Sequence, residues 1–169
     1  MHHQPDGAAF DVVLLLHVGC VIVGIVTMAT AAATASRLRR LLEASLPLPE
    51  PLRRYFRPGT NWAGRTIYGI PVFGLALIAM SQGAYALGQG WVLGGFAIFA
   101  VLAYLGERVL WPAEQRLRAA LAERSHGGDE AGGAGPGENV ARDATVVSRA
   151  AATALVLLVA GTMLMIAQP

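Results

Sequence analysis

The chain of 169 residues has no lysine, a single cysteine and few charged side chains. Only 14% of its residues are charged, whereas 54% are hydrophobic, and this balance excludes an ordinary soluble domain of this size. Because Cys20 is the only thiol, an internal disulfide, a cysteine-pair redox motif and a multi-cysteine zinc motif are also excluded. All thirteen positive side chains are arginine, and their positions carry most of the information on topology.

The sequence contains four long apolar stretches that have few charged residues. A helix needs about 20 apolar residues to cross the hydrocarbon core of a bilayer. The sequence predicts an all-α fold, a four-helix transmembrane bundle with short amphipathic helices on its cytoplasmic surface. Residues 1–11 are expected to form an extracytoplasmic tail, and the predicted spans are 12–34, 66–87, 91–110 and 150–167.

Two hydrophilic segments, 35–65 and 111–149, are predicted to be cytoplasmic loops. The first continues the preceding helix until closely spaced prolines enforce an extended stretch. The second starts with an amphipathic helix after Pro112, in which Glu114 precedes Arg118 by one helical turn. Glycines and acidic residues over 126–142 are expected to leave that stretch disordered, because they cannot bury enough apolar surface.

Proline and glycine also predict local features of the middle spans. If the second helix begins near Asn61, Pro71 removes one backbone hydrogen bond and predicts a kink near Ile67. The short link Gly88–Gly90 predicts that the second and third spans are antiparallel neighbours.

The arginines predict the orientation of the chain. Every arginine lies in or beside the two loops, and none lies in the N-terminal tail, the Gly88–Gly90 link or the last two residues. Since arginine near span ends is retained on the cytoplasmic side, both termini are expected to be extracytoplasmic. The lysine-free, arginine-rich composition is typical of a GC-rich genome. We expect the chain to lie in the cytoplasmic (inner) membrane of a bacterium. The expected partners of the loops are anionic lipid headgroups, with no nucleic acid.

His17 is the one histidine within a predicted span. On a helical wheel it shares a stripe with Cys20, Gly24, Met28 and Ala31, so we expect this stripe to face other helices. The simpler interpretation is a neutral imidazole that hydrogen-bonds across the bundle. The alternative is a haem or metal ligand, which would need further ligands from elsewhere.

Glu107 and Arg108 lie near the cytoplasmic end of the third span. The Arg108 guanidinium can reach the headgroups. Glu107 points about 100° away from it and needs a partner such as Arg65 or Arg149, which the sequence places at similar depth. The two interpretations are an interfacial ion pair that fixes helix register and a proton or substrate relay.

The N-terminal tail offers a further candidate. A free amine with histidine at position three can hold Cu(II) or Ni(II) in square-planar geometry, so His3, together with His2, is the candidate metal site of the chain. The alternative is an unstructured tail in which the histidines have no role.

Three segments carry a resemblance to a known family: LLLHVGCVIVG in the first span, TIYGIPVFGLAL in the second, and WPAEQRLRAAL after the third. On these the chain resembles an uncharacterised family of small four-span integral membrane proteins, distantly similar to the membrane domain of copper-resistance proteins. The copper-resistance comparison implies a copper role facing the periplasm. The uncharacterised family supplies no catalytic residue.

No span contains a set of residues that forms a catalytic centre, so the sequence predicts a non-enzymatic role without a cofactor. We expect an accessory or structural subunit that packs against a larger membrane complex or against another copy of itself. One alternative is a haem- or copper-related redox or metal-handling protein that uses His17. Another is a proton-coupled transporter that uses Glu107.

Overall fold

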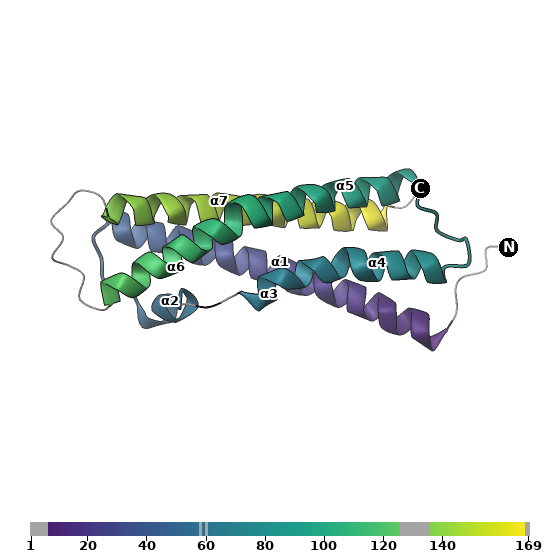
Figure 1. Ribbon diagram of the computed structural model, residues 1–169, viewed down its shortest axis with the longest axis horizontal. Coiled ribbons are helices and arrows are strands. Elements are labelled where there is room, and N and C mark those ends of the chain that lie inside the picture. Colours follow the sequence, from purple (N-terminus) through teal and green to yellow (C-terminus); the bar gives the residue numbers. More distant parts are fainter. Residues whose placement is uncertain (1–6, 58, 60, 126–135, 168–169) are drawn as a thin grey trace. The chain divides into compact units, whose positions relative to one another are not determined.

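The computed structural model describes residues 7–57, 59, 61–125 and 136–167, and in this part of the chain every regular element is helical. Figure 1 shows the elements in order. They are α1 (Ala8–Glu43), α2 (Glu50–Tyr55), α3 (Trp62–Arg65), the 3₁₀ turn η1 (Thr66–Tyr68), α4 (Gly69–Met80), α5 (Gly90–Leu105), the π-helical turn η2 (Gly106–Leu110), α6 (Trp111–Ser125) and α7 (Pro136–Ile166).

Four helical stretches are long and apolar enough to cross a membrane, which confirms the predicted fold class. Their bounds are Ala8–Glu43, Trp62–Met80, Gly90–Glu123 and Glu138–Ile166. The chain divides into two compact units. We call residues 1–27, 61–102 and 155–169 the first unit, and residues 28–60 and 103–154 the second unit.

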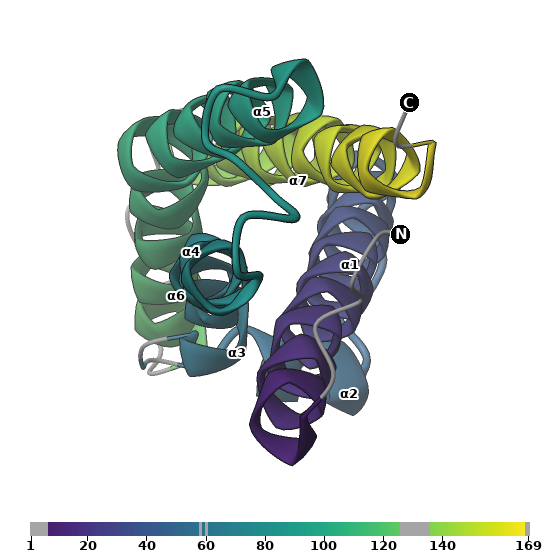
Figure 2. The ribbon, with the colours of Figure 1, turned by 90° about the vertical axis from the view of Figure 1, so that its right-hand side faces the viewer.

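The first unit contains four helical stretches, which Figure 2 views roughly along their axes: the start of α1, the continuous stretch of α3, η1 and α4, most of α5, and the end of α7. Its buried core is small and includes Ile67, Leu77 and Val92. Many of its large apolar side chains are exposed instead, among them Leu15 and Val72. Helices that are apolar on their outward faces suit a lipid environment.

At the position of the predicted kink, near Ile67, the second span changes helix type. The Asn61 side chain accepts a hydrogen bond from Gly64 N at 3.1 Å and so caps α3. The 3₁₀ turn η1 follows and contains Ile67, and α4 continues from Gly69. Pro71, which has no N–H to donate, explains why the backbone is interrupted there.

The second unit is built on small and medium side chains from α1, α6 and α7. Fully buried residues include Ala35 and Leu38 of α1, Leu117 of α6, and Ala144 and Ala151 of α7. Alanine at such positions lets helix backbones approach closely. The short α2 packs into the same unit through Leu52 and Phe56.

The structure corrects the predicted start of the fourth helix and the predicted extent of the loop before it. Helix α7 begins at Pro136, so residues 136–142, expected to be disordered, and residues 143–149, expected to be loop, are helical. The reason is burial, because Val140, Ala144 and Val147 pack into the second unit and stabilise turns that composition alone does not favour. The rest of the predicted disordered stretch, 126–135, lies outside the described residues.

Helix α4 also ends earlier than expected, at Met80. The backbone then adopts positive φ at Gln82 (50°) and Gly83 (91°), a conformation that ends a helix. The link to α5 is therefore residues 81–89, not the three residues around Gln89.

The third span and the amphipathic helix after it form a nearly uninterrupted helical stretch. Helix α5 passes into η2, and α6 starts at Trp111, so Pro112 lies in its first turn as predicted. One face of α6 is buried at Ala113 and Leu117, whereas Gln115 on the other side is exposed.

Candidate functional site

The start of α1 lies very close to α4 within the first unit, and three glycines make this approach feasible. A Cβ atom on Gly69 would lie 2.5 Å from Cys20 Sγ, and one on Gly74 would lie 3.3 Å from His17 Cε1. On the other side of the contact, a Cβ on Gly24 would lie 3.2 Å from Ile67. Each of these distances is shorter than ordinary contact, so the glycines provide the space that the cysteine, the imidazole and the isoleucine fill.

His17 is thereby fixed between two helices. Its side chain is 6% exposed, and Nδ1 donates a hydrogen bond to Ile70 O of α4 at 2.9 Å. A carbonyl oxygen only accepts, so the ring proton must reside on Nδ1. The interhelical hydrogen bond predicted for His17 is confirmed. The predicted inward stripe is confirmed as well, because Gly24, Met28 and Ala31 are buried and the half-buried Cys20 faces Gly69.

An apolar cavity of about 430 Å³ lies beside this histidine, within the first unit. All four helical segments of that unit contribute to its lining, which includes His17 and Gly74, Trp91, Gly95 and Phe99. Its size falls within the range of roughly 300–1,000 Å³ that small-molecule sites occupy. The sequence did not predict this cavity.

The turn after α4 positions two aromatic side chains of the lining. The Ser81 hydroxyl donates to Ile78 O at 2.7 Å and accepts a hydrogen bond from Tyr85 N at 3.1 Å. The Tyr85 ring meets the Trp91 ring edge to face, with centroids 5.7 Å apart. Such aromatic pairs are stabilising, and here they hold both rings beside the cavity.

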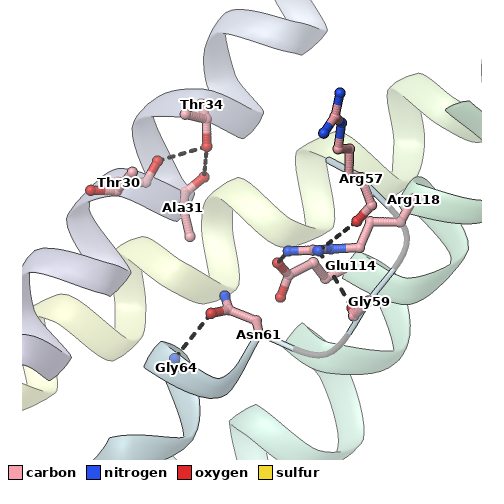
Figure 3. A network of polar contacts seen from close by, with 9 residues as sticks. All are labelled: Thr30, Ala31, Thr34, Arg57, Gly59, Asn61, Gly64, Glu114 and Arg118. Carbon is pink, nitrogen blue, oxygen red and sulfur yellow. Dashed lines mark hydrogen bonds and ion pairs between the residues drawn. The ribbon is translucent and has the colours of Figure 1, made fainter. Parts of the chain in front are cut away.

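A second polar centre lies in the second unit, around Glu114 and Arg118 of α6 (Figure 3). Arg118 Nη2 donates to Glu114 Oε1 at 2.5 Å, and their side chains are only 12% and 5% exposed, respectively. Arg118 Nη1 also donates to Arg57 O at 2.7 Å and to Gly59 O at 3.4 Å. The buried ion pair therefore fastens the segment after α2 to α6.

Tyr55 of α2 belongs to the same centre. Its hydroxyl is buried without a hydrogen bond of ordinary geometry, although a weak interaction with the Thr34 hydroxyl is present. Burial raises the pKa of the Tyr55 phenol above its ordinary value, and the Glu114 carboxylate raises it further. Tyr55 is consequently a neutral group at physiological pH.

Two further polar contacts link helices of the second unit. Arg116 Nη2 of α6 donates to Asp143 Oδ1 of α7 at 3.1 Å. The hydroxyls of Ser36 in α1 and Ser148 in α7 lie 2.6 Å apart. The polar residues of this unit thus serve mainly to join its helices.

The structure does not gather the predicted site residues into one centre. Glu107 and Arg108 are exposed on η2, and Arg65, the last residue of α3, lies 5.8 Å from the Trp62 ring in cation–π geometry. Glu107 has an interaction within the described chain, but its pairing with Arg65 or Arg149 stays a prediction. The metal site proposed for His2 and His3 lies outside the described residues.

Three functional candidates escaped the sequence analysis: the cavity, the burial of Glu114 with Arg118, and the environment of Tyr55. The spacing of Glu114 and Arg118 did predict their pairing, but on an exposed surface. Within the described parts of the chain, no group of three or more His, Cys, Asp or Glu side chains is placed to hold a metal ion. No family model, curated protein or solved structure matches the chain.

Proposed function

We propose that the protein is a non-enzymatic, accessory component of a membrane whose task is to hold a lipid-soluble ligand in the cavity of the first unit. The cavity beside His17 carries this proposal. Its lining is almost wholly apolar, and the helices around it are apolar on their outward faces as well. A ligand that dissolves in the bilayer can reach such a site without crossing water.

The proposal places the protein in the inner membrane of a bacterium, with both termini outside the cytoplasm. The distribution of charge supports this orientation, because twelve of the thirteen arginines belong to the second unit and only Arg65 to the first. Arg53, Arg54 and Arg57 around α2 are exposed and suit contact with anionic headgroups.

Cysteine labelling tests the orientation. In a Cys20→Ser background, Leu87→Cys introduces a thiol at an exposed position of the 81–89 link, and Arg53→Cys does so on α2. A membrane-impermeant maleimide added to intact cells is expected to label Leu87→Cys and to label Arg53→Cys only after permeabilisation. The reverse pattern would show that the orientation is inverted.

The accessory role includes a partner, either a larger membrane complex or a second copy of the chain. Small residues four apart on a helix can serve as contacts with another protein, as at Gly90 and Gly94 or Ala150 and Ala154. Here Gly94 packs inside the chain, because a Cβ on it would lie 2.8 Å from Leu164, and Ala150 and Ala154 are buried. The outward apolar face of the first unit is the surface that we assign to the partner. Purification in mild detergent tests this role, and a solitary monomer without a co-purifying protein would contradict it.

A different observation argues against each of the two alternative functions. A relay through Glu107 would need a path through the membrane, yet this carboxylate is exposed on η2. A haem or copper role for His17 would use Nε2 and further ligands, yet the described lining of the cavity contains no second histidine and no cysteine or carboxylate. Neither alternative accounts for the apolar cavity.

Filling the cavity is expected to abolish ligand binding. The probe is 1-aminoanthracene, a flat apolar fluorophore, added to the protein in phosphatidylcholine nanodiscs. Binding is measured as energy transfer from tryptophan, since Trp91 lines the cavity. Gly95→Leu places a side chain into the cavity and should reduce the transfer at least tenfold, while a Cβ there meets only Met165 Cε at an ordinary 3.7 Å.

Ala97→Leu is the matched control, because it adds the same side chain at an exposed position of α5. It should bind the fluorophore like the wild type, and both variants should keep the helical content of the wild type. Equal transfer in Gly95→Leu and Ala97→Leu would contradict the proposed function.

A further inference from the structure

The hydrogen bonding of His17 defines what the cavity offers to a ligand. Nδ1 is committed as a donor to Ile70 O, and the described residues give Nε2 no hydrogen bond. An apolar lining favours the neutral imidazole, since an unpaired buried charge is costly. A neutral ring with its proton on Nδ1 presents Nε2 as an acceptor only. The group that it recognises is therefore a hydrogen-bond donor.

The other residues of the lining indicate which kind of molecular scaffold the ligand has. Trp91, Phe96 and Phe99 of α5 supply aromatic surfaces, and the lining has no arginine or other side chain that carries a fixed charge. Aromatic side chains pack favourably against another flat ring, either edge to face or offset. A phosphate or carboxylate headgroup would find no cation to neutralise it here. The lining thus suits a flat, uncharged ring with few polar groups.

We infer that the cavity takes a lipid-soluble hydroquinone, whose phenolic hydroxyl donates a hydrogen bond to His17 Nε2 while its ring packs among the aromatic side chains of α5. This inference rests on the proposed function and specifies its ligand. It concerns binding alone. A quinone, the oxidised form of the same molecule, offers only acceptors and so cannot make this bond.

The test compares the two forms of one molecule in displacement of 1-aminoanthracene from the protein in nanodiscs under anaerobic conditions. Decylhydroquinone and decylbenzoquinone share shape and tail and differ in the two hydroxyl hydrogens. One neutral hydrogen bond corresponds to a preference of roughly 2–10-fold. We expect decylhydroquinone to displace the fluorophore from the wild type at a concentration lower by that factor.

Two variants assign the preference to His17. His17→Leu keeps an apolar side chain of similar bulk but has no acceptor, so the hydroquinone and the quinone should displace equally. His17→Gln can donate from its amide nitrogen to Ile70 O and accept through Oε1, so it should retain the preference. Should His17→Leu fail to fold, the preference of the wild type and of His17→Gln still decides the question.

The outcomes separate this inference from the proposed function. Equal displacement by both forms from the wild type overturns the inference, whereas the binding of 1-aminoanthracene and its loss in Gly95→Leu leave the proposed function standing. A co-purified phospholipid that neither form displaces also overturns the inference, in favour of an acyl-chain ligand. If 1-aminoanthracene does not bind to the wild type, both the inference and the proposed function are wrong.

Discussion

Replacing Glu114 with leucine is expected to lower the free energy of unfolding by about 3–5 kcal/mol, because it leaves the buried Arg118 guanidinium without its counter-ion. The two side chains are 5% and 12% exposed, so water cannot take the place of the carboxylate. The hydrogen bonds from Arg118 to Arg57 O and Gly59 O remain, but carbonyl dipoles do not neutralise a full charge. Reversible unfolding in detergent micelles, followed by circular dichroism, measures the loss.

Two comparisons isolate the effect of burial. Glu50→Leu removes a carboxylate with the same spacing from its arginine, Arg54, but these side chains are 60% and 70% exposed. Its cost should stay below about 1 kcal/mol. Adding Arg118→Met to Glu114→Leu should recover much of the stability, since an apolar pair can replace a buried ion pair. Equal costs for Glu114→Leu and Glu50→Leu would contradict the structure of this site.

The second large effect is expected where α1 meets α4. Gly69→Ala places a Cβ 2.5 Å from Cys20 Sγ, and such overpacking typically costs about 1–3 kcal/mol. In a Cys20→Ala background Sγ is absent and the nearest atom to this Cβ is Phe73 Cε2 at 3.3 Å, which a shift of a few tenths of an ångström in the ring relieves. The same substitution should then stabilise the protein by up to about 1 kcal/mol, because alanine favours a helix over glycine. The sign of the effect of Gly69→Ala thus depends on residue 20.

Gly19→Ala is the control for helix propensity. A Cβ on Gly19 meets nothing within 4 Å, although this residue is the immediate neighbour of Cys20. It should stabilise the protein by up to about 1 kcal/mol through helix propensity alone, whichever residue stands at position 20. If Gly69→Ala and Cys20→Ala are additive in the double variant, the close approach of the two helices is wrong.

The sequence predicts the fold class because a bilayer demands long apolar helices, and hydrophobic length alone identifies them. The inward stripe of α1 is also predictable, since spacing along a helix determines which residues share a face. The start of α7 is not, because residues 136–149 become helical through packing against other segments. Their composition, with one proline, one glycine and four charged residues among fourteen, suggests a loop, although Val140, Ala144 and Val147 recur at helical spacing.

The candidate site, like the fold, could be predicted from the sequence only in part. His17 could be identified as an interhelical hydrogen-bonding group from its polarity within an apolar run. Its hydrogen-bond acceptor, Ile70 O, could not be identified, because every residue has a backbone carbonyl and the sequence does not distinguish one from another. Glu114 and Arg118 could be paired from their spacing, but their burial depends on the segment after α2, whose carbonyl oxygens Arg118 binds. The cavity is a property of four segments together, and no local pattern encodes it.

The π-helical turn η2 affects how tolerant the second unit is to changes in chain length. A π turn accommodates one more residue than an α-helical turn, so it has the form of a single-residue insertion within a helix. Removing one residue between Gly106 and Leu110 would restore a regular helix and leave α6 near its present register, whereas removing one between Trp111 and Ala113, where the helix is already regular, would rotate Glu114 by about 100° relative to the turn before it. Glu114 would then point away from Arg57, whose carbonyl its partner binds. The register of this helix, and not its composition alone, therefore keeps the charged pair buried within the second unit.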